Sequence, residues 1–539
     1  MYVPGRPPGA TILSGGMEPR HFGHWPPGMP RSLRAPRTTL SKMFEDSAAR
    51  NPEKVAAVFE GTSISYGELR GKVESLAAHL QLACGVAPGE RVLLCMQNGL
   101  DFVIAFLGIL RAGAVVVPVS PMNVAAELRH YAADSDARVA LTEEDLVSRF
   151  SGLPLDELLL LRQVGQRQPA HDNLKPEPDP DALCVMPYTS GSTGNPKGCM
   201  HTHATVLHSV VGAAAWKHID DKAVALATAP FFHVTGMIHS FLATVWAGGT
   251  MVIQRRWDPL AAAGLVERHR CTHWDNVPTM VVDLLSHPGA LEHDLGSMKW
   301  IFGGGAAMPE AIAQKLYEVC GVRYIEGYGM TETISQTHIN PPQNPKKQCL
   351  GIPTFDTDAL VVDPDRFTAM DAGEQGEIVV RGPQLLAGYW KNEKAYRDSW
   401  CEVEGETGRF FRTGDLGRAD PDGYFYISDR LKRMINAAGF KVWPAEVEAA
   451  MYRHPAIKEC CIIASPDARR GETVKAVVVL KDDFLGKVAA QDIEAWSRAQ
   501  MAAYKVPRKI EFTDALPRTP SGKLMWRALQ EREFGRKPA

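Results

Sequence analysis

A stretch near residue 190 combines the residue types that bind phosphate groups. Residues Thr189 to Gly198, TSGSTGNPKG, hold hydroxyl side chains, glycines and a lysine within a short span. Glycines let a backbone approach an anion without a Cβ, hydroxyls donate hydrogen bonds, and Lys197 contributes a positive charge. This set suits the binding of a polyphosphate; the alternative interpretation is an ordinary Gly/Ser surface turn.

The segments on either side indicate how this stretch is held. Leu183 to Met186 form a short apolar run typical of a buried strand, and apolar residues from Thr202 to Val211 recur near the helical period. We therefore expect a strand, a loop and the start of a helix, with loop and helix N–H groups directed at the anion. A Walker A loop is excluded, because that motif needs G-x-x-x-x-G-K-[ST] and Gly198 follows Lys197 here.

Four further segments contain residues suited to a nucleotide. FGGGAAMPE, from Phe302 to Glu310, places three glycines at a strand end, and GYGMTET, from Gly327 to Thr333, combines an aromatic ring, a hydroxyl and the carboxylate of Glu332. These groups suit a base ring, a phosphate and a hard cation. Asp415 in a Gly-flanked turn suits ribose hydroxyls, and Lys523 lies on a Pro/Gly loop. Ordinary alternatives are a Gly-rich strand exit, a solvated carboxylate, an Asx-turn and a solvated lysine.

Composition narrows the class of protein. The chain has 539 residues, a formal net charge of −3, 45% hydrophobic and 22% charged residues, so it is long enough for two to four domains and gives no reason to expect a nucleic-acid surface. Its 10 cysteines include no CxxC pair, which disfavours structural zinc and a disulfide framework and predicts a cytoplasmic protein.

The chain begins with a Pro/Gly-rich leader that lacks the apolar region of a signal peptide. We expect residues 1–37 to be poorly ordered or draped over the surface. The most apolar stretch, residues 102–120, is interrupted by Arg111, Gly113 and Pro118. A buried helix that ends near Arg111, followed by a strand at Val115 to Val117, explains it better than a transmembrane segment, and we expect none.

Alternating helical patterns and short apolar strands from Leu40 to about Ser428 predict an α/β fold with largely parallel sheets. GEIVVRGP and DGYFYISDRLK indicate a β-rich subdomain with a hairpin turn at Asp422–Gly423. After this comes a compact α+β segment whose first helix starts near Pro444. We expect a large N-terminal domain over residues 38–429, made of layered α/β subdomains plus the β-rich subdomain, and a small C-terminal domain over residues 430–539.

Five motifs occur in an order that resembles the acyl-adenylate-forming (ANL) superfamily, and most closely its acyl-CoA synthetase branch. They are YTSGSTGNPKG, GYGMTET, RTGDLG, DRLKRMINAAGFKVWPAEVE and PRTPSGK. The resemblance covers nearly the whole chain after the leader. It implies a mobile C-terminal domain that acts as a lid, ATP, Mg²⁺ and coenzyme A as cofactors and substrates, and small-molecule partners without nucleic acid. A homodimer is left open.

The resemblance also assigns roles to residues. Lys523, Thr331 and Glu332 would be catalytic, Lys523 as the mobile lysine of adenylation, Thr331 at the α-phosphate, and Glu332 with Thr193 at the metal. Lys432 would be the hinge, with Gly439 and Phe440 along the approach of the thiol; Asn436 stands where some relatives have a second lysine, and receives no role. ATP and AMP would be bound by Thr189, Ser190, Gly191, Ser192, Thr193, Gly194, Lys197, Gly304, Gly305, Ala306, Tyr328, Gly329, Met330, Asp415 and Arg430.

The acid is harder to predict than the reaction. PFFHVTGMIHSFLATVWAGG and WDNVPTM resemble the walls of the family's acyl pocket, with His233 at its mouth and Val234, Met237, Asn276 and Gly303 in its lining; core packing is the alternative for each. An apolar acid is favoured, with a medium- or long-chain fatty acid first and an aryl or branched acid second.

The acceptor is predicted from what the pocket segment lacks. Phe231-Phe232-His233 offers no aspartate to an amino acid's ammonium, so we expect an acyl-CoA ligase rather than a peptide-synthetase domain. Three alternatives are left open: an adenylating enzyme that passes the acyl group to a carrier protein, a nucleotide-binding regulator without turnover, and a luciferase-like oxygenase.

Overall fold

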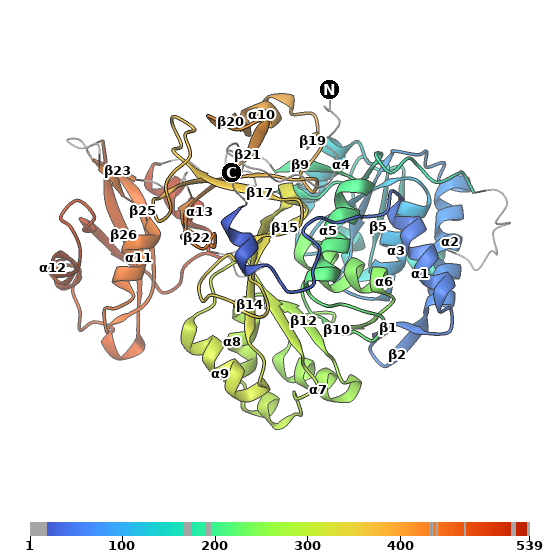
Figure 1. Ribbon diagram of the computed structural model, residues 1–539, viewed down its shortest axis with the longest axis horizontal. Helices are drawn as coiled ribbons and strands as arrows, with labels where there is room; N and C mark the ends of the chain where they lie inside the picture. The colour runs from blue at the N-terminus through green and yellow to red at the C-terminus, as the bar shows by residue number, and fades with distance from the viewer. Residues whose placement is uncertain are drawn as a thin grey trace.

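The computed structural model describes residues 19–164, 174–189, 196–430, 433, 435–437, 440–442, 444–467, 471–518 and 524–535. Within them the large domain contains two extensive sheets, a β-rich subdomain joins these to the C-terminal domain, and Figure 1 shows the C-terminal domain on one side of the molecule. The expected α/β class, with a large N-terminal and a smaller C-terminal domain, is confirmed.

The first sheet carries most of the motif residues. Its order is β16-β15-β14-β13-β12-β10-β11-β1-β2, parallel from β14 to β1 and antiparallel at both edges. Parallel strands end at one edge of a sheet, so the motifs that follow β12, β13 and β14 meet there. The strands are β1 Val55–Phe59, β2 Thr62–Ser65, β10 Val224–Ala227, β11 Thr250–Ile253, β12 His273–Asn276, β13 Trp300–Gly303, β14 Tyr324–Met330, β15 Ser335–Ile339 and β16 Ile352–Pro353.

The second sheet has the order β19-β9-β7-β4-β3-β5-β6, and β8 pairs with β9. Its central strands are parallel and buried, as their runs of Val and Leu predict. The strands are β3 Arg91–Cys95, β4 Val115–Pro118, β5 Val139–Thr142, β6 Glu157–Leu159, β7 Leu183–Val185, β8 Tyr188–Thr189, β9 Lys197–Thr202 and β19 Gly388–Tyr389.

One helix layer packs between the two sheets and shares a single apolar cluster with both. Its members are α1 Leu40–Arg50, α2 Tyr66–Leu82, α3 Leu100–Arg111, α5 His203–Trp216, the π-helix η5 Gly236–Leu242 and α6 Ala243–Ala247. The side chains of α3 from Phe102 to Leu110 are all buried, and burial of each large apolar side chain contributes about 2 kcal/mol. This explains the apolar run as a core helix, and none of the described helices is long and apolar enough to cross a membrane.

Other helices cover the outer faces of the sheets. They are α4 Ala125–Ser135, α7 Pro259–His269, α8 Pro278–Ser286 and α9 Glu310–Cys320, with the 3₁₀ turns η2 Glu144–Phe150, η3 Leu161–Gln163 and η6 Pro288–Glu292. A second apolar cluster lies under α7, α8 and α9 and contains Trp274 and Tyr324.

The β-rich subdomain has the order β17-β18-β21-β20, with β22 paired to β21. Gly423 has φ +84° in the turn that joins β21 to β22, so the predicted Asp422–Gly423 hairpin is confirmed. The elements are β17 Asp358–Val362, β18 Gly376–Arg381, α10 Glu393–Asp398, β20 Trp400–Glu402, β21 Arg409–Ala419 and β22 Phe425–Arg430.

The C-terminal domain packs its helices on a mixed sheet with the order β24-β23-β26-β25, in which β27 pairs with β26. The helix expected near Pro444 is present. The elements are β23 Ile435–Ala437, β24 Phe440–Val442, α11 Pro444–Met451, β25 Ile457–Asp467, β26 Gly471–Leu480, η9 Asp482–Phe484, α12 Ala490–Gln500, β27 Lys509–Phe512 and α13 Trp526–Glu533.

The described part of the leader lies on the surface of the large domain. Residues 20–24 form the 3₁₀ turn η1 (Arg20–His24), and the ring of Trp25 packs edge-on against Trp216 and Phe355. His21 is buried beside Gly423, where an added Cβ would lie 2.8 Å from the His21 nitrogen. Residues 19–37 are therefore draped over the large domain, which was one of the two expectations.

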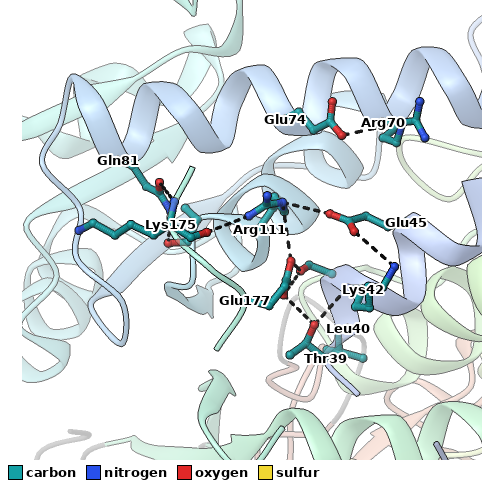
Figure 2. Close-up of polar contacts among 12 residues, drawn as sticks. Thr39, Leu40, Lys42, Glu45, Arg70, Glu74, Gln81, Arg111, Lys175 and Glu177 are labelled. Atoms are coloured by element: carbon teal, nitrogen blue, oxygen red, sulfur yellow. Dashed lines mark hydrogen bonds and ion pairs between the residues drawn. The ribbon is translucent and has the colours of Figure 1, made fainter. Parts of the chain in front are cut away.

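The segment before β7 is tied to the helix layer by a charged cluster, drawn in Figure 2. Glu177 accepts hydrogen bonds from Thr39 at 2.7 Å and Ser41 at 2.5 Å, and it lies 3.6 Å from the Arg111 guanidinium. Arg111 also pairs with Glu45 at 3.1 Å. The half-buried arginine at the end of α3 is thus neutralised, and the chain is fixed where it enters the strand that leads to Thr189.

The expected order of strand, loop and helix is wrong at one point. The strand β9 follows Pro196 and pairs antiparallel with β8 and β7, so the Gly/Ser/Thr stretch joins two strands of a hairpin. Helix α5 begins only at His203, and the Thr202 side chain caps it by accepting from the Thr205 N–H. The first N–H groups of the helix therefore lie at the end of β9 opposite to Lys197. β-branched Thr202 was the strand signal that the sequence offered.

Candidate active site

The β8–β9 hairpin lies against the Thr331–Glu332 turn. Thr189 pairs with Lys197 across the hairpin, and the His201 Nε2 lies 2.8 Å from the Thr331 carbonyl oxygen, to which it donates. The turn itself is the 3₁₀ segment η7 (Thr331–Thr333), which contacts β8. Two motifs far apart in sequence are therefore adjacent. Residues 190–195, which contain Ser190, Gly191, Ser192, Thr193 and Gly194, lie outside the described residues.

Glu332 is a buried carboxylate with a positive charge nearby. It is 8% exposed, and its Oε1 accepts a hydrogen bond of 3.0 Å from the Tyr389 hydroxyl. The Lys197 ammonium lies 5.0 Å from the centre of the Tyr389 ring. Burial and the negative charge of Glu332 raise the pKa of Tyr389, so this hydroxyl stays protonated and donates. The carboxylate is thus held in place beside the hairpin.

The glycines at the ends of β13 and β14 allow close backbone packing. A Cβ on Gly304 would lie 2.6 Å from the Gly327 carbonyl oxygen, and one on Gly329 would lie 1.6 Å from the Ser335 oxygen. Gly305 has φ +81°, which glycine adopts without strain, and Ala306 follows it. These positions leave a flat backbone surface next to Tyr328, as a base ring requires.

Tyr328 and Asp415 connect the first sheet to the β-rich subdomain. The Tyr328 hydroxyl donates to Asp415 Oδ2 at 2.5 Å, and Asp415 is fully buried. The Asp415 N–H donates to Thr413 Oγ1 at 3.0 Å, and Asp415 lies within strand β21 rather than in the turn that the sequence predicted. Asp415 pairs with Arg430 across β21 and β22, although the arginine side chain lies outside the described part of the chain. The structure thus joins the predicted base and ribose residues through a direct contact.

The predicted acyl-pocket residues come from the segment that leads into η5 and from the ends of β12 and β13. His233 is exposed and its Nδ1 accepts from the Thr235 N–H at 3.3 Å, whereas Val234 and Met237 are buried in the shared apolar cluster. Asn276 is fully buried at the end of β12 and accepts from the Tyr324 hydroxyl at 3.2 Å. A Cβ on Gly303 would lie 1.8 Å from that hydroxyl. A lining role for these residues stays a prediction.

Three features of the site were not identified from the sequence. Tyr389 contacts Glu332 from β19, far along the chain, and no local motif marks it. The π-helix η5 starts at Gly236, where a Cβ would lie 2.3 Å from the Pro230 oxygen. Glu326 lies opposite Gly303 on β14 and accepts from the N–H groups of Met308 and Cys349, both at 3.0 Å. Burial raises the pKa of Glu326 to about 7. For the helix η5, the available sequence signals were Pro230, which precedes it, and Gly236, its first residue.

Several predicted residues lie outside the described part of the chain. Lys432, Gly439 and Lys523 are among them, so their roles as hinge, thiol approach and catalytic lysine stay predictions. Phe440 is placed only as the first residue of β24.

The described residues fit ATP and, through one carboxylate, a magnesium ion. The glycine backbone at Gly304 and the buried Asp415 match a base and a ribose, and Glu332 offers a hard oxygen ligand. Among the described residues no group of three or more His, Cys, Asp or Glu side chains could hold a metal. A magnesium ion here would therefore take its remaining ligands from phosphate and water, which is the usual coordination of Mg²⁺ in nucleotide sites.

Fold and site together define a two-domain nucleotide-binding enzyme that has no Walker A loop. Comparison with known proteins identifies the family to which this enzyme belongs. Residues 44–390 match the model of the AMP-binding enzyme family, and residues 446–523 match the AMP-binding enzyme C-terminal domain. The chain belongs to this family, in the acyl-CoA synthetase branch of the acyl-adenylate-forming superfamily, and is an AMP-forming acid–thiol ligase.

The relatives are named for different acids. The chain is 33% identical to a long-chain-fatty-acid–CoA ligase of Bacillus subtilis (95% of this chain, 98% of that protein). It is 36% identical to a feruloyl-CoA synthase of an Amycolatopsis species (90% and 97%). The solved structure of the o-succinylbenzoate–CoA synthetase of Bacillus subtilis with ATP and magnesium superposes with a TM-score of 0.79 at 26% identity, over 90% of this chain and 98% of that one.

Proposed function

We propose that this ligase activates an acid with an apolar body in two steps, through the residues assembled above. The first step forms an acyl-adenylate and releases pyrophosphate, and the second transfers the acyl group to coenzyme A and releases AMP. The observation that carries these residue roles is the contact between the β8–β9 hairpin and the turn that holds Glu332. It brings Thr189, Lys197 and a buried carboxylate to one place.

The first step requires positive charge more than proton transfer. Both reactants are anionic, and two unit charges about 4 Å apart repel by roughly 4 kcal/mol at an effective dielectric constant near 20. Lys197 from the hairpin and Lys523 from the C-terminal domain would offset this charge. A magnesium ion held by Glu332 would add to it when bound. Asp415 and Tyr328 would fix the ribose and the base, so that the α-phosphorus faces the carboxylate.

The second step requires the lysine to leave. A thiol must reach the acyl carbonyl where Lys523 would lie, so we place these two functions on alternate positions of the C-terminal domain. Lys432 would be the hinge, and Gly439 with Phe440 would line the approach of the thiol. Support comes from the position of these residues directly after β22, the strand that pairs with the Asp415 segment.

The acid has two candidate classes. A medium- or long-chain fatty acid is supported by the apolar side chains of Val234 and Met237 and by the relative named for long-chain fatty acids. An aryl acid is supported by the relative named for feruloyl-CoA and by buried polar groups on η5 and β15, described below.

The test measures pyrophosphate release with ATP and Mg²⁺ for a panel of acids. The panel runs from acetate to palmitate and includes benzoate and cinnamate, and each acid is tested with and without coenzyme A. A coenzyme A-dependent maximum for one class of acid supports the proposal and names the acid. Release that is independent of coenzyme A would move the acceptor to a carrier protein, and no release with any acid would overturn the proposal.

We also propose a cytoplasmic location. All ten cysteines are free thiols, most of them buried, as in proteins of a reducing compartment. The homodimer stays a prediction that a measurement of mass in solution would test.

A further inference from the structure

Four buried polar atoms behind the adenylate motif have no hydrogen-bond partner among the described residues. They are Oγ of Ser209 on α5, Nδ1 of His239 and Oγ of Ser240 on η5, and Oε1 of Gln336 on β15. Each of these residues is at most 7% exposed. Folded proteins pair the great majority of such atoms, and an unpaired one costs about 1–3 kcal/mol. Four on adjoining elements therefore indicate that something else supplies their partners.

The four atoms belong to one place in the fold. The Gln336 amide nitrogen donates to the Ser209 carbonyl oxygen at 2.8 Å, which joins β15 to α5. The neighbouring Ser335 hydroxyl lies 2.8 Å from His239 Nε2, which joins β15 to η5. Helix α5 contacts both β15 and η5, and α5 and β15 lie side by side in Figure 1. These atoms are called the polar cluster below.

The polar cluster adjoins the predicted AMP-binding residues. The Ser335 carbonyl oxygen occupies the position that a Gly329 side chain would need, 1.6 Å from its Cβ. Gly329 belongs to the motif that contains Thr331 and Glu332. Ser335, which adjoins Gly329, also contacts His239 of the cluster, so an acid whose carboxylate is bound at this motif would lie close to the polar cluster.

The charge balance of this region favours a neutral ligand group. Lys217 at the end of α5 pairs with Asp275 on β12, and their side chains are 4% and 6% exposed. The Lys217 ammonium also lies 4.7 Å from the centre of the Phe302 ring. Because this buried cation is already matched by a carboxylate, a second carboxylate on the substrate would lack a counter-charge.

His239 is suited to a neutral partner as well. Burial and the charge of Lys217 lower the pKa of His239 well below its usual range, so its ring is uncharged. A neutral ring nitrogen either donates or accepts, and a hydroxyl group does both. The π-helix that carries His239 is a rare conformation found most often at functional sites.

We propose that the acid carries a neutral hydroxyl group at the end of its body remote from the carboxylate, and that Ser209, His239 and Gln336 bind this group. The cluster requires that the hydroxyl is uncharged, and a phenol and an aliphatic alcohol both meet this requirement. This inference rests on the proposed function, because it concerns the acid that the ligase activates.

The experiment compares matched acids with and without the hydroxyl. The value of kcat/KM for pyrophosphate release is measured for 4-hydroxycinnamate against cinnamate, and for 10-hydroxydecanoate against decanoate. We expect at least one hydroxylated acid to exceed its unsubstituted partner by about 30-fold or more, because an unfilled polar site rejects an analogue that lacks the group. Which pair shows this effect distinguishes a phenol from an alcohol.

Variants then locate the effect. Ser209→Ala and Gln336→Met should lower kcat/KM for the preferred hydroxylated acid about tenfold, and much less for its unsubstituted partner. Ser297→Ala is the control, because Ser297 is also a buried serine and donates to the Cys271 carbonyl oxygen on the far side of the sheet. It should leave the ratio between the paired acids unchanged.

Two outcomes would overturn the inference. In one, each unsubstituted acid is activated as well as its hydroxylated partner; in the other, Ser209→Ala and Gln336→Met lower both members of a pair equally. Either result, with coenzyme A-dependent turnover intact, leaves the proposed function standing. Absence of turnover with all acids would instead overturn the proposed function and with it this inference.

Discussion

Glu332 is the residue on which the proposed adenylation chemistry most depends. Its carboxylate is buried, oriented by the Tyr389 hydroxyl, and placed in a turn that contacts the β8–β9 hairpin. Burial of a carboxylate costs desolvation free energy, which the hydrogen bond from Tyr389 offsets in part and a bound cation would offset further.

Replacement of this carboxylate tests that role. Glu332→Gln should lower the rate of pyrophosphate formation by about 100-fold, the usual effect of one lost electrostatic contact in a transition state. Tyr389→Phe keeps the carboxylate and removes only its hydrogen bond, so it should cost about tenfold or less. Steady-state rates at saturating ATP provide the measurement, and equal losses in both variants would contradict the assigned role.

Glu326 gives a prediction on stability and pH. Its pKa is raised to about 7 from an ordinary 4.5, because burial disfavours the charged form. A raised carboxyl pKa means that the folded state binds the proton more tightly. Its contribution to stability is therefore complete below pH 4.5 and is lost as the pH rises through 7, by about 3 kcal/mol in total.

Glu326→Gln removes this titration. The free energy of unfolding of Glu326→Gln relative to the wild type should rise by about 3 kcal/mol between pH 4.5 and pH 8, on top of a constant offset from the altered amide contacts. Chemical denaturation at several pH values measures it. Glu53→Gln, at an exposed side chain, is the control, and a difference for Glu326→Gln that does not change with pH would show that its carboxyl is not responsible.

At the scale of elements, sequence patterns predicted the strands and core helices well. The apolar runs at Val92, Val116 and Val139 became parallel strands because a buried sheet needs continuous apolar residues. The helix over residues 100–111 ended at Arg111 as expected. Patterns failed where tertiary pairing decides the structure: β9 exists because β7 and β8 pair with it.

The same limit applies to the site. The motif residues were found because each carries a local signature, and the structure joins Tyr328 to Asp415 and the hairpin to Glu332. Tyr389, Glu326 and the polar cluster have no local signature, because their roles come from burial and from partners distant in sequence. No pattern within one segment could have predicted them.

The β14–β15 turn should be intolerant of side chains. Gly329→Ala would place a Cβ 1.6 Å from the Ser335 oxygen, so the turn must move or unfold. We expect pyrophosphate formation to fall by more than about 100-fold, or soluble expression to be lost. The matched control is Gly71→Ala, an exposed position within α2 where the added methyl meets nothing and should stabilise by about 1 kcal/mol. Wild-type rates in Gly329→Ala would refute the packing described.

At the scale of the whole molecule, the proposal divides two reactions between two positions of one domain. The large domain holds most of the residues that we propose for the nucleotide, and the C-terminal domain follows directly after β22. We propose that Lys523 acts at the carbonyl in one orientation of this domain, and that Gly439 and Phe440 line the approach of the thiol in another. A rotation between the half-reactions is therefore expected.

Two variants separate the half-reactions. Lys523→Ala should slow adenylation by about 100-fold or more and affect thioester formation from preformed acyl-adenylate much less. Lys432→Pro should slow thioester formation and affect adenylation much less, because the fixed φ of proline restricts the hinge. Rapid-quench assays of each half-reaction measure this. Equal effects of both variants on both steps would contradict the division.

The central claim is that the carboxylate attacks the α-phosphorus and that the thiol then attacks the acyl carbon. This path leaves one carboxylate oxygen on AMP. The most direct measurement is therefore turnover of an acid labelled with ¹⁸O in both carboxyl oxygens, followed by mass spectrometry of the products. The account predicts one ¹⁸O atom in AMP and none in pyrophosphate; label in orthophosphate together with ADP would show attack at the γ-phosphorus and contradict it.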